Sequence, residues 1–232
     1  MLEDLKQIVW QTNMDLVKYG LVIFTWGNVS GIDRDKGLVA IKPSGLAYED
    51  MAPEDICIVD MDGKLVEGKF RPSSDTGTHL EIYKAFENVG GVVHTHSEYA
   101  TSWAQAQRDL KICGTTHGDS FYGDVPCTRA MTDAEINIGD YEENTGKVIA
   151  ECFAQRKLNP EYMQAVLVAN HGPFTWGKDA FEALHNSVIL ETVAKMAFVT
   201  HSLNPNTPMN NLLTEKHFMR KHGPNAYYGQ SK

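Results

Sequence analysis

The strongest constraint on the fold is a pair of histidines, His94 and His96, that directly follows the short apolar run 91–93. An apolar run of this length predicts a buried strand. Residues two apart in a strand point to the same face, so both imidazoles can aim at one point. A second apolar run, 165–169, ends at Asn170-His171-Gly172 and could bring a third imidazole from a neighbouring strand. The fold must then place two strand ends close together.

Three neutral imidazoles with an open fourth position are typical of a catalytic zinc site rather than a structural one. Taken singly, each of the nine histidines is better explained as an ordinary core or loop residue. The spacing of these three favours metal binding, and Mn²⁺ or Co²⁺ could replace Zn²⁺ at such ligands. Asp75 could complete or support the site, although a helix cap is the commoner role for an aspartate just before a predicted helix.

Composition limits the remaining function classes. A chain of 232 residues without repeats or linkers predicts a single domain over 1–232. The net charge of −9 argues against nucleic-acid binding, which needs a basic face. No run of eighteen apolar residues predicts a membrane span, and the acidic N-terminus is unlike a signal peptide. The four cysteines show no Cys-x-x-Cys pairing, so we expect a reducing, cytoplasmic location.

The periodicity of hydrophobic residues predicts the helices and strands. Residues 2–19 have helical spacing. Strand-like runs cover 21–25, 28–32, 38–41, 56–59 and 64–66, with hairpin loops at 33–37 and 60–63. Helices are predicted at 74–86, 97–107 (capped by Ser97), 141–155, 179–202 and 212–222, and another starts at the capping-box pair Thr132 and Glu135. We therefore expect an α/β (α+β layered) protein, a three-layer α/β/α arrangement around a largely antiparallel sheet.

Other segments offer polar groups for a substrate. Residues 42–45 and 72–74 combine hydroxyls with backbone N–H groups that suit a phosphate, although simple turns are the commoner outcome. Asp119 lies in a glycine-broken polar stretch and could be an acid/base group or an exposed turn residue. Tyr227 and Tyr228 near the C-terminus suggest docking, and a tyrosine hydroxyl near a metal can also be a general acid.

Together these motifs resemble the class II aldolase/adducin family and, within it, the L-ribulose-5-phosphate 4-epimerases. The resemblance runs in order along essentially the whole chain. The segments that carry it are 25–30, 41–45, 72–75, 94–96, 114–117, Pro126-Cys127-Thr128-Arg129, 171–174, 216–223 and 227–230.

The resemblance implies a set of site residues. Zinc is held by His94, His96 and His171, with Asp75 as an additional ligand. Asp119 and Tyr228 are the acid/base pair. The substrate phosphate lies among Gly27, Asn28, Ser44, Gly45, Ser73 and Ser74. Supporting residues are Lys42, Thr116, Glu142, His217 and Arg220.

The resemblance also implies activity and assembly. Similar enzymes are metal-dependent isomerases that interconvert L-ribulose 5-phosphate and D-xylulose 5-phosphate in arabinose or ascorbate catabolism. They use retro-aldol cleavage, aldehyde rotation and aldol re-addition. They are homotetramers with sites between subunits, and the C-terminal tail completes the active site. Gly118 and Ser120 depart from the pattern, because similar epimerases have Ala and an aromatic residue beside the aspartate.

Three alternatives stay open on the sequence. A class II sugar-phosphate aldolase has the same metal core but releases the aldehyde. A non-catalytic, adducin-like interaction module shares the fold. A metal hydrolase would use the same histidines, but it needs a water-activating carboxylate that the sequence does not identify.

Overall fold

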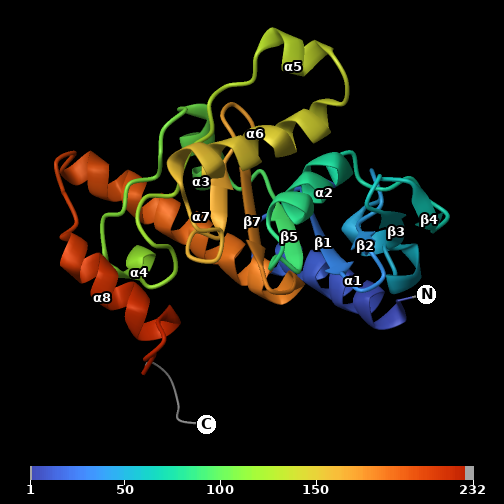
Figure 1. Cartoon of the computed structure of the whole chain (residues 1–232), viewed down its shortest axis with the longest axis horizontal. Helices are drawn as coiled ribbons and strands as arrows, with labels where there is room; N and C mark the ends of the chain where they lie inside the picture. Colours follow the sequence, from blue (N-terminus) through green and yellow to red (C-terminus); the bar gives the residue numbers. More distant parts are fainter. Residues whose placement is uncertain (1, 228–232) are drawn as a thin grey trace.

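The protein is described from a computed structural model over residues 2–227 (Figure 1). One sheet of seven strands has the order β4-β3-β2-β1-β5-β7-β6, and every neighbouring pair is antiparallel. The strands are β1 (Asn28–Asp33), β2 (Leu38–Ile41), β3 (Cys57–Asp60), β4 (Leu65–Glu67), β5 (Gly91–His94), β6 (Ala165–Leu167) and β7 (Pro173–Gly177). The predicted antiparallel sheet is confirmed.

Helices cover the sheet in the expected layers. The α-helices are α1 (Glu3–Lys18), α2 (Thr76–Ala85), α3 (Glu98–Gln105), α4 (Thr115–Gly118), α5 (Asp133–Asn137), α6 (Tyr141–Arg156), α7 (Ala180–Leu203) and α8 (Asn211–His222), with short 3₁₀ turns η1 (Tyr48–Asp50) and η2 (Pro53–Asp55). In Figure 1, α4 and α8 lie together at the end of the molecule opposite strands β2–β4.

Alternation along the strands sets the two faces of the sheet. Val29 and Val93 pack with Leu16 of α1 and with residues of α7. Val92, on the other face, packs in a cluster with Tyr83 of α2 and with residues of α6. Strand β5 is therefore buried on both faces, as its apolar run predicts, and it ends at His94.

Two details of the predicted sheet are wrong. Residues 21–25 form a loop instead of a strand, with Phe24 at φ 56° and 79% exposed, because they pair with no neighbouring strand. Strand β7 was not expected, and it lies between β5 and β6. His171 therefore comes from the β6–β7 turn, directly before the strand that pairs with β5.

The helix caps are confirmed in one case and wrong in another. Thr132 and Glu135 form the predicted capping box at the start of α5. Ser97 precedes α3 but makes no capping hydrogen bond within the described residues. Instead, the carboxylate of Glu191 in α7 accepts hydrogen bonds from the N–H groups of Tyr99 and Ala100, both at 2.9 Å. A carboxylate that is distant in the sequence therefore takes the place of the local cap at the helix N-terminus.

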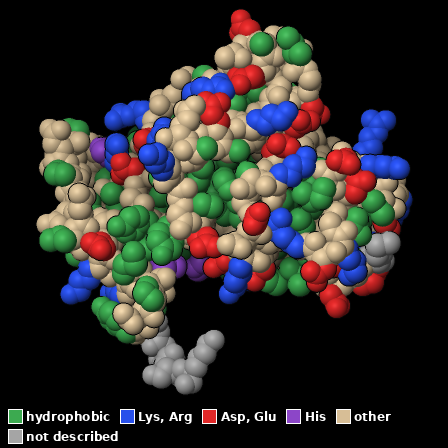
Figure 2. All heavy atoms as spheres, in the orientation of Figure 1, with side chains coloured by type: hydrophobic (Ala, Val, Ile, Leu, Met, Phe, Trp, Pro, Cys, Tyr) green, Lys and Arg blue, Asp and Glu red, His purple; other side chains and the backbone are tan. Residues whose placement is uncertain are grey.

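The surface carries mixed charge. Figure 2 shows acidic and basic side chains interspersed over the face it presents, without an extended basic area there. This agrees with the net charge of −9. Over residues 2–227, no helix combines the length and apolar character needed to cross a bilayer.

Candidate active site

Three histidines come together at the end of the sheet. His94 ends β5, His96 follows two residues later, and His171 lies in the β6–β7 turn. Their nitrogen ligand atoms all lie within 4.8 Å of one another. The Nε2 atoms of His94 and His96 are 3.0 Å apart. Within residues 2–227 this is the one cluster of three or more such ligand groups. The prediction that the three imidazoles lie close together is confirmed.

The protonation of these imidazoles suits a divalent cation. His94 Nδ1 lies 3.0 Å from the carbonyl oxygen of Pro173, which can only accept, so Nδ1 donates and Nε2 keeps a lone pair. Burial, together with the neighbouring imidazoles, lowers the pKa of His171 to about 3, and burial also lowers the pKa of His96. Buried Nδ1 of His171 has no partner within the described residues. Neutral imidazoles with free lone pairs are the donors that zinc takes.

Local packing fixes the two strand ends against each other. Phe174 of β7 stacks on the His94 ring at 4.2 Å between centroids. A Cβ on Gly172 would come within 2.8 Å of the carbonyl oxygen of Thr95, so only glycine allows this approach. The turn that carries His171 therefore presses directly on the His94–His96 segment.

Asp75 lies beside the cluster and does not cap its helix. It occupies the N-cap position of α2, but no capping hydrogen bond from its side chain occurs in the described part of the chain. Its carboxylate accepts a hydrogen bond from Asn28 Nδ2 at 2.6 Å. Burial would raise the pKa of Asp75, but the His94 and His79 imidazoles and the Asn28 amide hold it below its usual value. The cap role favoured by sequence is thus wrong, and the ionised carboxylate faces the imidazoles.

A cavity of about 520 Å³ opens next to the histidines. Every residue that the resemblance assigns to the phosphate lines it, and His96 and Asp75 reach it from the metal cluster. Its lining is Thr25, Trp26, Gly27, Asn28, Lys42, Pro43, Ser44, Gly45, Ser73, Ser74, Asp75 and His96.

Backbone contacts hold the two serine-containing segments side by side. Ser44 N–H donates to the carbonyl of Arg71, and Ser73 N–H donates to the carbonyl of Lys42, both at 2.9 Å. Segments 30 residues apart in the sequence therefore present their hydroxyls to one cavity. The sequence indicated each segment but not their pairing.

Lys42 supplies the positive charge of this cavity. Its Nζ donates to the carbonyl of Leu46 at 2.9 Å and lies 4.8 Å from the Tyr48 ring centroid. Burial lowers the pKa of Lys42 to about 8. The ammonium is therefore mostly charged at neutral pH and can attract an anion.

The other predicted catalytic residues form a separate cluster between α4 and α8. Asp119 accepts hydrogen bonds from His217 Nδ1 and from Arg220, each at 2.9 Å, and Lys221 lies 3.5 Å away. These partners hold the pKa of Asp119 below its usual value although burial would raise it. Thr116 lines a different cavity, between α4 and α7. None of these residues lines the cavity beside His96, and Tyr228 lies outside the described residues.

The sequence did not indicate two aromatic residues that lie near the histidines. The Trp26 ring lies 6.3 Å from that of His96 and lines the cavity, and the Tyr141 ring lies 6.4 Å from that of His171. The segment 25–30 could have indicated Trp26, because it lies next to two of the assigned phosphate residues. Tyr141 gives no comparable signal, since it reads as the first residue of an ordinary helix.

Comparison with known proteins defines the class. Residues 7–198 match the family model of the class II aldolase and adducin N-terminal domain. The chain belongs to the class II aldolase and adducin family.

Individual members of the family are similar to this chain over nearly its whole length. The chain is 57% identical to L-ribulose-5-phosphate 4-epimerase UlaF of Salmonella paratyphi A over 230 residues, which cover 99% of this chain and 100% of that one. The Salmonella typhi protein of the same name matches equally well. Among solved structures, an L-fuculose 1-phosphate aldolase superposes with a TM-score of 0.78 at 27% identity, covering 92% of this chain and 94% of that one.

Proposed function

We propose that the chain is a metal-dependent L-ribulose-5-phosphate 4-epimerase, an isomerase that interconverts L-ribulose 5-phosphate and D-xylulose 5-phosphate in pentose catabolism. The observation that carries the proposal is one juxtaposition: the three-histidine cluster opens on a cavity built by both phosphate-type segments. Relatives 57% identical over nearly the whole chain bear the epimerase name.

The reaction needs carbon–carbon cleavage. Carbon 4 is not adjacent to the carbonyl at carbon 2, so its hydrogen is not acidic. Removing the proton of the carbon 4 hydroxyl lets the carbon 3–carbon 4 bond break, and its electron pair passes to the enediolate. Because the phosphate is on carbon 5, the fragments are the enediolate of dihydroxyacetone and glycolaldehyde phosphate, rather than dihydroxyacetone phosphate and glycolaldehyde. Rotation of the aldehyde before the bond reforms inverts carbon 4.

The histidine cluster would hold the metal ion. We assign His94, His96 and His171 as ligands of Zn²⁺, with Mn²⁺ or Co²⁺ as substitutes, and Asp75 as an additional ligand or support. When bound, the ion supplies positive charge that stabilises the negative charge developing on the carbon 2 and carbon 3 oxygens. The chain's contribution is to keep the imidazoles neutral and oriented.

The phosphate cavity explains why the product is an epimer. The phosphate belongs to the aldehyde fragment, so the hydroxyls of Ser44, Ser73 and Ser74 and the charge of Lys42 hold that fragment after cleavage. A fragment held by its phosphate can still rotate about the carbon 4–carbon 5 bond. Retention with rotation gives an epimerase, whereas release gives an aldolase.

The acid/base pair would come from a neighbouring subunit. We assign Asp119 and Tyr228 to opposite faces of the aldehyde, with Thr116, His217 and Arg220 in support. The Asp119 cluster is separate from its own chain's cavity, so it can serve another copy in a homotetramer. Exposed hydrophobic side chains also gather on α8 and the end of α7 (Figure 2). They are Met196, Phe198, Val199, Leu203, Leu212 and Leu213.

The test is a product assay. Zinc-loaded protein is incubated with L-ribulose 5-phosphate, and D-xylulose 5-phosphate is measured against a metal-stripped control. Metal-dependent product supports the proposal. Accumulation of free glycolaldehyde phosphate would assign an aldolase instead. No reaction by zinc-loaded protein would reject this substrate, and failure to bind any metal would favour the adducin-like module.

A further inference from the structure

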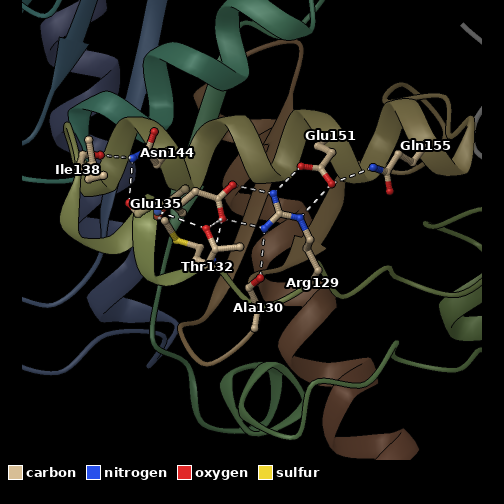
Figure 3. A network of polar contacts seen from close by, with 10 residues as sticks. Arg129, Ala130, Thr132, Glu135, Ile138, Asn144, Glu151 and Gln155 are labelled. Atoms are coloured by element: carbon tan, nitrogen blue, oxygen red, sulfur yellow. Dashed lines mark hydrogen bonds and ion pairs between the residues drawn. The ribbon is translucent and has the colours of Figure 1, made fainter.

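The motif residue Arg129 has a structural role that the proposed reaction does not use. Figure 3 shows its guanidinium between two carboxylates. It binds Glu135 through NH1 at 2.8 Å and NH2 at 2.7 Å, and Glu151 through Nε at 2.9 Å and NH2 at 2.6 Å. Paired bidentate contacts fix position as well as charge. Arg129 therefore ties α5 to the middle of α6.

Polar contacts define the shape of the α5–α6 elbow, residues 132–144. Helix α5 buries none of its own side chains. Asn144 Nδ2 donates to the carbonyls of Glu135 at 2.8 Å and Ile138 at 3.0 Å, and the Asp140 carboxylate caps α6 by accepting from Glu143 N–H at 2.8 Å. Figure 3 shows these contacts around Asn144 continuing the Arg129 network. A surface turn without apolar packing is thus given a defined geometry.

The elbow places the first turn of α6 beside the metal cluster. The Tyr141 ring lies 6.4 Å from the His171 ring, at an interplanar angle of 32°. The carbonyl of Glu142 accepts a hydrogen bond from Thr78 in the first turn of α2 at 2.6 Å. Burial raises the pKa of Glu142, and the charges of Asp140 and Asp75 raise it further. This turn therefore lies against the same helix start that carries Asp75.

Tyr141 lies beside His171, outside the lining of the phosphate cavity. His96 and Asp75 line the phosphate cavity, whereas His171 and Tyr141 do not. The Tyr141 side chain is 38% exposed, and its hydroxyl has no hydrogen-bond partner among residues 2–227. A ketopentose with its carbon 5 phosphate in the cavity and its carbon 2 and 3 oxygens at the histidines extends carbon 1 out of the phosphate cavity. Tyr141 offers a hydroxyl beside His171 and outside that cavity.

We propose that the Tyr141 hydroxyl binds the carbon 1 hydroxyl of the substrate, and that Arg129 is a positioning residue that acts through Tyr141 by fixing the α5–α6 elbow. The inference rests on the proposed function and adds recognition of the non-phosphorylated end of the sugar. This role would explain the Arg129 network. Ordering a surface elbow costs conformational entropy, and α5 buries no side chain that would offset this cost.

The test compares Tyr141→Phe with the unchanged protein on two substrates, L-ribulose 5-phosphate and its 1-deoxy analogue. Loss of one neutral hydrogen bond should lower kcat/KM for the natural substrate about 5- to 10-fold, mainly through KM, and leave the analogue unaffected. Zinc content should not change. Tyr19→Phe, at an exposed tyrosine after α1, is the matched control. An equal loss on both substrates, or none on either, overturns the assignment.

Arg129→Met tests the positioning role. It should give the same substrate-selective loss, and the double variant with Tyr141→Phe should be no worse than the more impaired single variant. Additive losses would overturn the role of Arg129. The unchanged protein distinguishes failure of the proposed function from failure of this inference. If zinc-loaded unchanged protein does not turn over L-ribulose 5-phosphate, the proposed function is rejected. If it turns the substrate over normally and Tyr141→Phe is unaffected, only this inference is rejected.

Discussion

At the scale of single residues, burial sets the charge of the candidate site. His171 is kept neutral by a pKa of about 3, while Lys42 stays mostly charged at neutral pH with a pKa of about 8. Desolvation thus leaves lone pairs at the histidines, whereas it lowers the pKa of Lys42 too little to remove its positive charge at neutral pH. At pH values between these two pKa values, His171 is neutral, as metal binding requires, and Lys42 is charged, as phosphate binding requires.

Removing one imidazole should remove the metal. His96→Ala leaves two ligands of the three-histidine cluster, so we expect zinc affinity to fall by at least about 10²-fold. Metal content after dialysis, measured by atomic emission, checks this. His185→Ala, at an exposed histidine of α7, is the matched control and should retain the metal. Full zinc loading of His96→Ala would reject His96 as a ligand.

The charge of Lys42 should make substrate binding pH-dependent. Because burial lowers the pKa of Lys42 to about 8, its ammonium loses the proton as the pH rises through that value. KM should then rise, approaching about tenfold per pH unit well above pH 8. Lys42→Met should have a high KM that no longer rises in this range. Profiles from pH 7 to pH 9.5 test this, with the exposed Lys36→Met as control. A constant KM for the unchanged protein contradicts the role.

At the scale of elements, the start of β5 has no room for a side chain. A Cβ on Gly90 would lie 2.0 Å from the carbonyl oxygen of Lys178, which is backbone and cannot move aside cheaply. Gly90 N–H also donates to the carbonyl of Gly177 at 2.8 Å, which fixes β5 against β7. This contact helps to set where His94 emerges from the sheet.

Gly90→Ala should therefore destabilise the protein by about 1–3 kcal/mol through overpacking. Chemical denaturation measures this, and a partial loss of zinc affinity should accompany it if the end of β5 shifts. Gly114→Ala is the matched control, because no heavy atom lies within 4 Å of its added Cβ. Identical denaturation midpoints for the two variants would contradict the packing argument.

The elements show what the sequence could reveal. Helices and hairpins follow local periodicity and turn residues, so the capping box at Thr132 and the hairpins of β1–β4 were predictable. The strand predicted at 21–25 failed because apolar character does not guarantee a pairing partner. The N-cap of α3 failed because its acceptor, Glu191, lies about 90 residues away in sequence. The histidine triad was predictable because His94 and His96 are spaced two apart after one apolar run and His171 follows another. The partners of Asp119 depend on α8 docking against α4.

At the scale of the whole molecule, the candidate catalytic groups form two clusters in one chain. The histidines and the phosphate cavity lie at the end of β5, while Asp119 lies between α4 and α8 with its partners His217 and Arg220. Neither cluster alone supplies both a metal and an acid/base group. A ring of subunits in which each chain lends Asp119 to its neighbour would complete every site, and the exposed hydrophobic residues of α7 and α8 provide surface for such contacts.

Mixing two inactive variants tests this arrangement. His96→Ala should lose the metal, and Asp119→Asn should lose about 10²-fold or more in turnover while keeping zinc. If each site takes its metal from one chain and Asp119 from the next, some sites in a mixed ring contain neither substitution. An equal mixture that exchanges subunits should recover about one quarter of the unchanged activity. If both groups act within one chain, every site carries one of the two substitutions, and the mixture stays inactive.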